Sequence, residues 1–125
     1  MIDRKKFISA VVAVAALSAL PFSVQAQTME SKLRRMGQTK TLKFVDLRAV
    51  KRNNLLTVQA TLMHEAKRDM NINYRFKWLD NSGMKVADDG VWNPKLIYAG
   101  QTFELTDIAP TPMATDFMIE IEGFN

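Results

Sequence analysis

Residues Met70–Gly83, MNINYRFKWLDNSG, give the clearest indication of the fold, because large apolar residues recur in them at every second position. This period is that of a β-strand with one buried face. The aromatic residues of the apolar parity are the predicted core-defining residues: Tyr74, Phe76 and Trp78. Arg75 and Lys77 have the other parity and should face outward. Asp80 to Gly83 favours a turn, so the strand should end there.

On both sides of this segment, short apolar runs between turn residues predict more strands at 41–50, 56–62, 84–87, 91–98, 102–106 and 115–122. In the first run the apolar parity changes midway, which indicates a β-bulge or a switch of sheet. Pro94 cannot donate to a strand pair and predicts an edge or a break. About seven short strands with no helix between them predict an all-β, immunoglobulin-like antiparallel β-sandwich.

The first 26 residues have the pattern of a secretory signal peptide. Three cationic residues precede a 14-residue apolar run from Phe7 to Leu20, and small residues stand before an expected cleavage after Ala26. The run is shorter than the ~20 residues of a membrane-spanning helix. The chain contains no cysteine to carry a lipid. We therefore expect an exported, periplasmic protein without a stable membrane anchor after cleavage.

The expected mature chain, residues 27–125, has room for one domain. We predict a flexible basic arm or frayed helix over 27–40 and the sandwich domain over 41–125. Without cysteine there is neither a disulfide nor a thiolate metal site. Removing residues 1–26 leaves 14 basic and 12 acidic residues.

Charge is distributed unevenly along the chain. Residues 27–52 carry eight basic and two acidic side chains, whereas residues 99–125 carry five acidic and no basic ones. The basic segment either meets an anionic partner or is a solvated linker. Nucleic acid is not expected as the partner, because the exported chain has no basic motif interleaved with aromatic residues.

The run Asn73–Asp80, NYRFKWLD, together with Gly83 and Trp92, resembles the YcfL family of small bacterial envelope proteins, a domain of unknown function. The resemblance extends from about Leu42 onward. It implies an immunoglobulin-like β-sandwich in the periplasm of a Gram-negative bacterium, and it implies no reaction. Some relatives are encoded beside activators of peptidoglycan synthases, which suggests a role in wall assembly. Several relatives resemble lipoproteins, from which this chain departs by lacking the cysteine.

His64 and the methionines raise an alternative, which is small-ligand or copper handling. Thioether sulfur selects Cu(I). Seven methionines remain after cleavage, but they are scattered along the sequence and methionine also fills cores: Met29, Met36, Met63, Met70, Met84, Met113 and Met118. His64 ends the strand in phase with Leu62, which favours a half-buried or turn-anchoring imidazole. It cannot build an ordinary zinc site alone, so we predict no metal site and no cofactor. Trp92 either packs at the core margin or stands at a rim.

No catalytic residues are predicted, and we expect a protein that is not an enzyme. Asp80, Asp88 and Asp89 fall in turn sequences, where carboxylates cap their own backbone. Glu120 and Glu122 alternate with apolar residues and are expected on the solvent face of the last strand. Ser31 and Ser82 have no nucleophile-elbow context.

The sequence therefore predicts a binding or assembly module that contacts another envelope protein through a sheet edge or the loops at one end. The candidate contact residues are the exposed cations Arg48, Lys51, Arg52, Arg75 and Lys77. The partner, the stoichiometry and the biological process are not indicated by the sequence.

Overall fold

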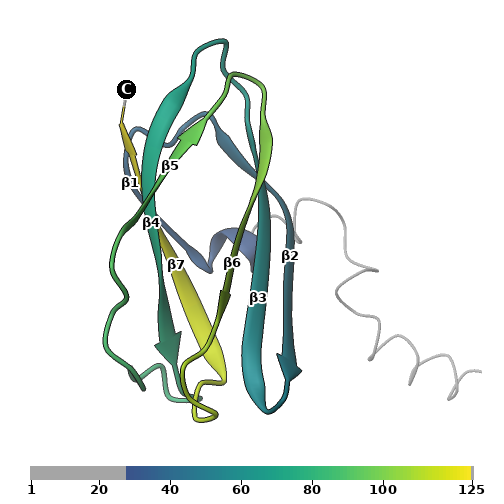
Figure 1. The fold of residues 1–125 in the computed structure, drawn as a ribbon, viewed down its shortest axis with the longest axis vertical. Coiled ribbons are helices and arrows are strands. Elements are labelled where there is room, and N and C mark those ends of the chain that lie inside the picture. Colours follow the sequence, from purple (N-terminus) through teal and green to yellow (C-terminus); the bar gives the residue numbers. More distant parts are fainter. Residues whose placement is uncertain (1–27, 125) are drawn as a thin grey trace, which may run out of the picture.

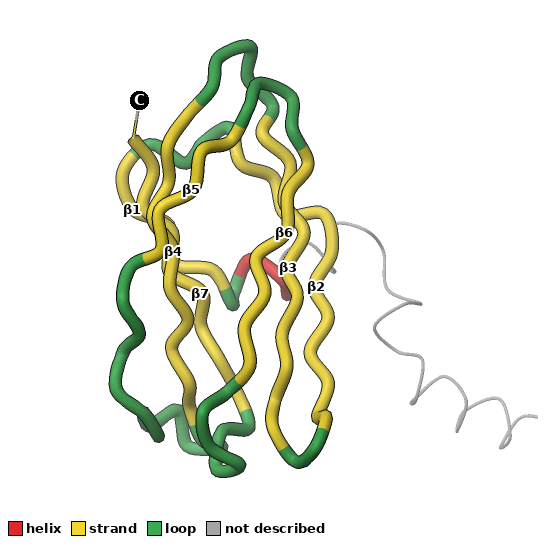
Figure 2. Tube along the Cα trace, in the orientation of Figure 1, coloured by secondary structure: helices red, strands yellow, loops and turns green. Residues whose placement is uncertain are grey.

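Seven strands form two facing sheets in the computed structural model, which describes residues 28–124. Figures 1 and 2 show the sheets side by side, with a single helical turn at residues 28–30. One sheet has the order β1-β7-β4-β5 and the other β2-β3-β6. The strands are β1 (Leu33–Gly37), β2 (Leu42–Arg52), β3 (Leu55–His64), β4 (Met70–Leu79), β5 (Asn93–Ile97), β6 (Thr102–Ile108) and β7 (Asp116–Phe124).

Strand β4 organises the core as its pattern predicts. It lies between β7 and β5, and the side chains of Phe76 and Trp78 are buried and stack with ring centroids 5.7 Å apart. Tyr74 is half-buried at the margin of the same core. Arg75 and Lys77 have the outward parity, as expected. Buried residues of β3, β6 and β7 meet this face from both sheets.

The predicted irregularity in the first apolar run is a β-bulge in β2. The pairing of β2 with β3 shifts between Phe44 and Asp46, so Val45 is an extra residue and is about half exposed. The hairpin then turns at Asn53 and Asn54, both of which have positive φ. Two such residues are typical of a type I′ turn, whose twist matches that of the flanking strands. The parity change in the sequence therefore correctly indicated a β-bulge.

The expected helix or flexible arm over 27–40 is wrong for residues 33–37, which form β1. This strand pairs in parallel with β7, with Leu33 opposite Ile119 and Gly37 opposite Gly123. Leu33 is buried in the core. A five-residue strand has little periodicity of its own, so the spacing of Met29, Leu33 and Met36 imitates a weak helix. Its parallel partner lies more than eighty residues away, and local sequence carries no sign of that pairing.

The expected strand at 84–87 is reduced to one bridge, between Leu79 and Lys85. Asp80 ends β4 as a turn residue, because its Oδ1 accepts hydrogen bonds from the N–H groups of Ser82 and Met84. Residues 84–92 then run to β5, a short edge strand that contains Pro94 as predicted. The total of seven strands is therefore confirmed, although β1 replaces the segment 84–87.

The pairing matches an immunoglobulin-like sandwich with one change. The β2-β3-β6 sheet corresponds to strands A, B and E, and the β7-β4-β5 part corresponds to F, C and C′. The N-terminal β1 occupies the edge beside β7 where a C-terminal strand G would lie. All other pairs are antiparallel. The predicted signal peptide, residues 1–26, lies outside the described residues.

Candidate functional site

A buried carboxylate lies on the outer face of the β1-β7-β4-β5 sheet. Register places Glu120 of β7 directly between Arg34 of β1 and Arg75 of β4. The distances from their nitrogens to the Glu120 carboxylate are 3.1 Å and 2.7 Å, and Lys77 Nζ lies 3.8 Å away. Only 2% of the Glu120 side chain is exposed. We call these four residues the Glu120 cluster.

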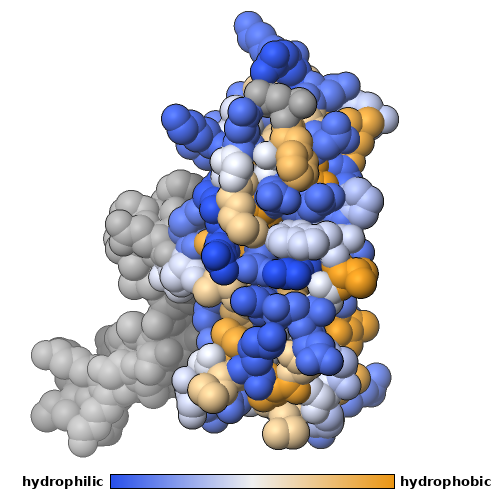
Figure 3. All heavy atoms as spheres, turned by 90° about the vertical axis from the view of Figure 1, so that its left-hand side faces the viewer, coloured by the Kyte–Doolittle hydropathy of each residue, from blue (hydrophilic) through white to orange (hydrophobic). Residues whose placement is uncertain are grey.

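The Glu120 cluster extends to the segment before β5. The guanidinium of Arg75 lies over the ring of Trp92, 4.2 Å from its centroid, and 3.9 Å from Asp89. Asp89 is also 3.4 Å from Lys85 Nζ. Trp92 therefore packs on the outer face of the sheet against a cation, which is a cation–π arrangement and not the core margin. Figure 3 shows this side of the molecule, with hydrophilic side chains across its middle.

The sequence-based placement of Glu120 on the solvent face is wrong with respect to burial. Its side chain does point away from the core, but Arg34 and Arg75 cover it from the neighbouring strands. Ion pairs with cations of both flanking strands compensate for the burial of this carboxylate. The alternating pattern of β7 correctly predicted that the Glu120 side chain points away from the core. The register, which the sequence does not show, determines its surroundings.

The five predicted contact residues do not form one surface. Arg48, Lys51 and Arg52 are exposed on β2, in the other sheet from Arg75 and Lys77. The latter two are about three-quarters buried and are engaged by Glu120. On β2 the sole ion pair described is between Arg48 and Asp46, at 3.1 Å and largely exposed. We call Arg48, Lys51 and Arg52 the β2 cations.

The strand that carries the β2 cations is uncovered both along its backbone edge and on part of its inner face. β2 pairs only with β3, so the backbone along its other side has no strand partner within residues 28–124. Ala49 and Lys51 lie opposite the buried Val58 and Leu56 and so have the inward parity, yet both are exposed. Val50 is 48% exposed. The second half of β2 is thus uncovered on its inner face as well as along its edge.

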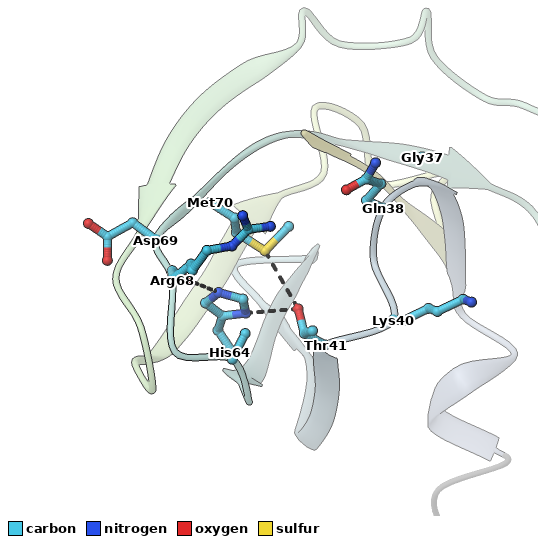
Figure 4. A pocket seen from close by; sticks show the side chains of 9 residues that line it. Gly37, Gln38, Lys40, Thr41, His64, Arg68, Asp69 and Met70 are labelled. Atoms are coloured by element: carbon cyan, nitrogen blue, oxygen red, sulfur yellow. Dashed lines mark hydrogen bonds between the residues drawn. The ribbon is translucent and has the colours of Figure 1, made fainter. Parts of the chain in front are cut away.

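A pocket of about 430 Å³ lies at the end of the sandwich where β1 leads into β2 and β3 leads into β4 (Figure 4). Its lining comes from these two connections and the strand ends beside them. The lining residues are Gly37, Gln38, Lys40, Thr41, His64, Ala66, Arg68, Asp69 and Met70. The β2–β3 turn lies at the opposite end of the molecule (Figure 1). The pocket and the β2 cations are therefore separate regions.

His64 forms the base of this pocket and is 2% exposed. Its Nε2 lies 2.6 Å from the carbonyl oxygen of Arg68, so Nε2 carries the hydrogen in that bond. In the neutral ring, Nδ1 then accepts from the hydroxyl of Thr41 at 2.9 Å. Both nitrogens are thus engaged in anchoring the connection to β4. This is the turn-anchoring role that the sequence predicts for His64.

The copper alternative gains no support from this geometry. A copper ligand needs a nitrogen lone pair, and both His64 nitrogens hold hydrogen bonds. Met70 is the methionine that shares the pocket with His64. Met84 and Met113 are about two-thirds exposed on loops. Residues 28–124 contain no group of three or more His, Cys, Asp or Glu side chains that could hold a metal ion.

Two further polar residues, Ser31 and Asp107, have local hydrogen-bond partners. Ser31 Oγ donates to the carbonyl of Thr28. Partial burial raises the pKa of the Asp107 carboxyl above its ordinary 3.8, against a smaller opposing effect of the N–H of Ile108, which donates to it. Neither group lines the pocket.

No helix within the described part of the chain is long and apolar enough to cross a membrane.

These observations define a small β-sandwich protein with an open charged edge, a charged face whose cations pair with a buried carboxylate, and a pocket at one end. The chain belongs to the family described as "Protein of unknown function (DUF1425)", whose model matches residues 25–123. A search of curated proteins found no match.

Two solved structures are similar to this chain. The crystal structure of Campylobacter jejuni Cj0090 has a TM-score of 0.64 and 23% identity, and the match covers 74% of this chain and 98% of that one. A DUF1425 family member from Shewanella sp. PV-4 has a TM-score of 0.59 and 21% identity, with 64% and 75% covered. At this identity the likeness shows the fold. Neither structure is described by a function.

Proposed function

We propose that this protein is a non-enzymatic binding module of the bacterial periplasm, which captures an acidic, extended segment of another envelope protein along the edge of β2. Strand addition to an open sheet edge is a common way for a sandwich to bind a peptide. Main-chain hydrogen bonds would supply the affinity, and the β2 cations would select acidic sequences.

The observation that carries this proposal is the state of β2. It is an eleven-residue edge strand whose second half is uncovered and whose β2 cations are balanced by Asp46 alone within the strand. Exposed lysines also protect edges against unwanted pairing. Two exposed apolar residues of β2 favour a docking role over simple protection: Val45 at the bulge and Val50 among the cations are each 48% exposed.

The cellular setting is part of the proposal and rests on sequence. The predicted signal peptide with cleavage after Ala26 supports export. The resemblance to the YcfL family supports an envelope location and a link to peptidoglycan synthesis. The absence of a cysteine from the sequence supports a protein that is not lipid-anchored.

Site-specific photo-crosslinking in cells tests the proposal. A photoreactive residue replaces Val50 on the β2 edge, and a matched control replaces Ile108, which is 57% exposed on β6 at the other edge of the same sheet. We expect a specific crosslinked protein from position 50 and not from position 108. Mass spectrometry of the crosslinked peptide should identify an acidic segment of the partner.

A charge-reversed variant completes the test. Changing Arg48, Lys51 and Arg52 to glutamate should abolish the crosslink from position 50 and leave the circular dichroism spectrum unchanged. A synthetic copy of the crosslinked segment should bind the original protein, with an affinity that falls as salt rises. An undiminished crosslink in the charge-reversed variant, or a crosslinked segment without acidic residues, would overturn the assignment of β2.

A further inference from the structure

We infer that the end pocket is a binding site for a small carboxylate ligand with a short aliphatic portion, and that Arg68 is the residue that holds the carboxylate. This site is distinct from the β2 edge and does not depend on the proposed protein partner. The inference rests on the pairing state of the arginines, the direction of the side chains around the pocket and the composition of its walls.

Arg68 differs from most arginines of the described chain. Arg34, Arg35, Arg48 and Arg75 each pair with a carboxylate. The guanidinium groups of Arg52 and Arg68 have no ion-pair or hydrogen-bond partner among residues 28–124. Both side chains are exposed, but Arg52 lies at the end of β2 whereas Arg68 lines a pocket. A guanidinium presents a planar fork of donors that matches a carboxylate.

The acidic residue beside Arg68 does not neutralise it. Figure 4 shows the carboxylate of Asp69 directed away from the pocket, whereas the side chain of Arg68 extends in the other direction, above His64. Asp69 Oδ1 instead accepts a hydrogen bond of 2.9 Å from the N–H of Ala99. Lys40 lies on the opposite side of the pocket, and its side chain extends away from the centre (Figure 4).

The base of the pocket is fixed before any ligand arrives. Through its two hydrogen bonds, His64 connects the carbonyl of Arg68 in the β3–β4 segment to Thr41, the residue before β2. The backbone N–H of Glu65 also donates to the carbonyl of Thr41, at 2.8 Å. A rigid base lowers the entropy cost of holding a ligand. Because His64 bonds to the carbonyl of Arg68, the side chain of Arg68 can be changed without removing this anchor.

The size and walls of the pocket specify the ligand class. A volume of about 430 Å³ lies at the low end of small-molecule sites. Ala66 and Met70 supply apolar wall, and Gln38 supplies an amide across from Arg68 (Figure 4). A phosphate dianion would favour two converging cations, but Lys40 extends away from the centre. One fork of donors beside apolar wall fits a monocarboxylate with a few carbon atoms.

An NMR titration of the ¹⁵N-labelled protein with propionate tests the site. Propionamide, which has a similar shape and no charge, and inorganic phosphate at matched ionic strength are the comparison probes. We expect propionate to shift the Arg68 Nε–H and Gln38 side-chain amide signals, and propionamide to leave them in place. Failure of propionate to move these signals would overturn the inference, and tighter binding of phosphate would overturn the ligand class.

Two matched variants locate the binding. Arg68→Gln should weaken propionate binding at least tenfold, because a charge-assisted bond is lost. Arg52→Gln removes the same charge from the other unpaired arginine, at the far end of the molecule, and should leave propionate binding unchanged. Equal weakening in both variants would show a general charge effect and overturn the site. Unchanged binding in Arg68→Gln would also overturn it.

Discussion

The two groups of cations in this chain differ in whether they pair with a carboxylate. In the Glu120 cluster, three cations from β1 and β4 converge on one buried carboxylate. On β2, three cations of similar sequence appearance are balanced by a single exposed aspartate. The comparison shows that cations become available to a partner only where the neighbouring strand supplies no carboxylate. Pairing across strands, and not local charge density, separates a structural region from a candidate binding region.

The largest effect should follow from removing the carboxylate of the Glu120 cluster. Glu120→Gln keeps the shape of the side chain but leaves the surrounding cations without their shared partner. Losing one partner of a buried ion pair typically costs 3–5 kcal/mol, and we expect about 3 kcal/mol because Arg34 can still reach water. Urea unfolding followed by circular dichroism measures this change. Glu122→Gln, two residues along the same face, is the control and should change stability by less than ~0.5 kcal/mol.

A somewhat smaller effect is expected where β1 approaches β7 most closely. A Cβ on Gly123 would lie 2.2 Å from the carbonyl oxygen of Gln38, which is backbone and cannot rotate away. Gly123→Ala should therefore push β1 from its place and destabilise the fold by about 2 kcal/mol. Gly90→Ala is the control, because a Cβ there meets open space.

Hydrogen exchange gives a second measurement for Gly123→Ala. The N–H of Gln38 donates to the carbonyl of Gly123, and the N–H of Ile119 donates to the carbonyl of Lys32. Both amides should lose protection in the variant ahead of the amides of β3. Uniform loss across both sheets would contradict a local displacement of β1.

Replacing single arginines should change stability less, and by different amounts in the two regions. Arg34→Gln removes one ion-pair partner of Glu120. Because the side chain of Arg34 is 60% exposed, we expect the free energy of unfolding to fall by at most ~1 kcal/mol. Arg48→Gln breaks a pair in which both side chains are at least half exposed and should have no measurable effect on stability. Thermal unfolding of both variants at low and high salt measures the difference. A larger loss for Arg48→Gln would reverse our distinction between structural and available cations.

The smallest expected effect concerns Asp107 on β6, the edge strand opposite β2. Its pKa is raised by partial burial, so the folded state binds this proton more tightly than the unfolded chain. The resulting contribution to stability is present below the ordinary pKa of 3.8 and is lost as pH rises through the raised value. Asp107→Asn should remove this slight pH dependence in acid urea titrations. An Asp107→Asn variant whose pH profile overlays that of the original protein would contradict the raised pKa.

Much of the fold could be predicted because each of its main strands carries its own pattern. The alternation around Phe76 and Trp78, the parity change before Asp46 and the Asn53–Asn54 turn are local signals. What could not be predicted depends on pairs distant in sequence. β1 gains its identity from β7, and Glu120 gains its burial from Arg34 and Arg75.

The candidate sites show the same division. The exposure of the β2 cations follows from their position before a turn, and the sequence indicated them. The end pocket joins Gln38, His64 and Arg68 from two connections that are remote along the chain. The phase of His64 with Leu62 predicted its burial. It could not show that Arg68 lies unpaired above it.

The parallel pairing of β1 with β7 also constrains the order in which the protein can fold. Chains are made from the N-terminus, so the first strand is synthesised long before its partner. Residues 33–37 must wait for residues 119–123, and Arg34 must wait for Glu120, while the β2–β3 hairpin can already form. The edge beside β7 is therefore completed last, and a truncation that removes the final ten residues would leave β1 without a neighbour.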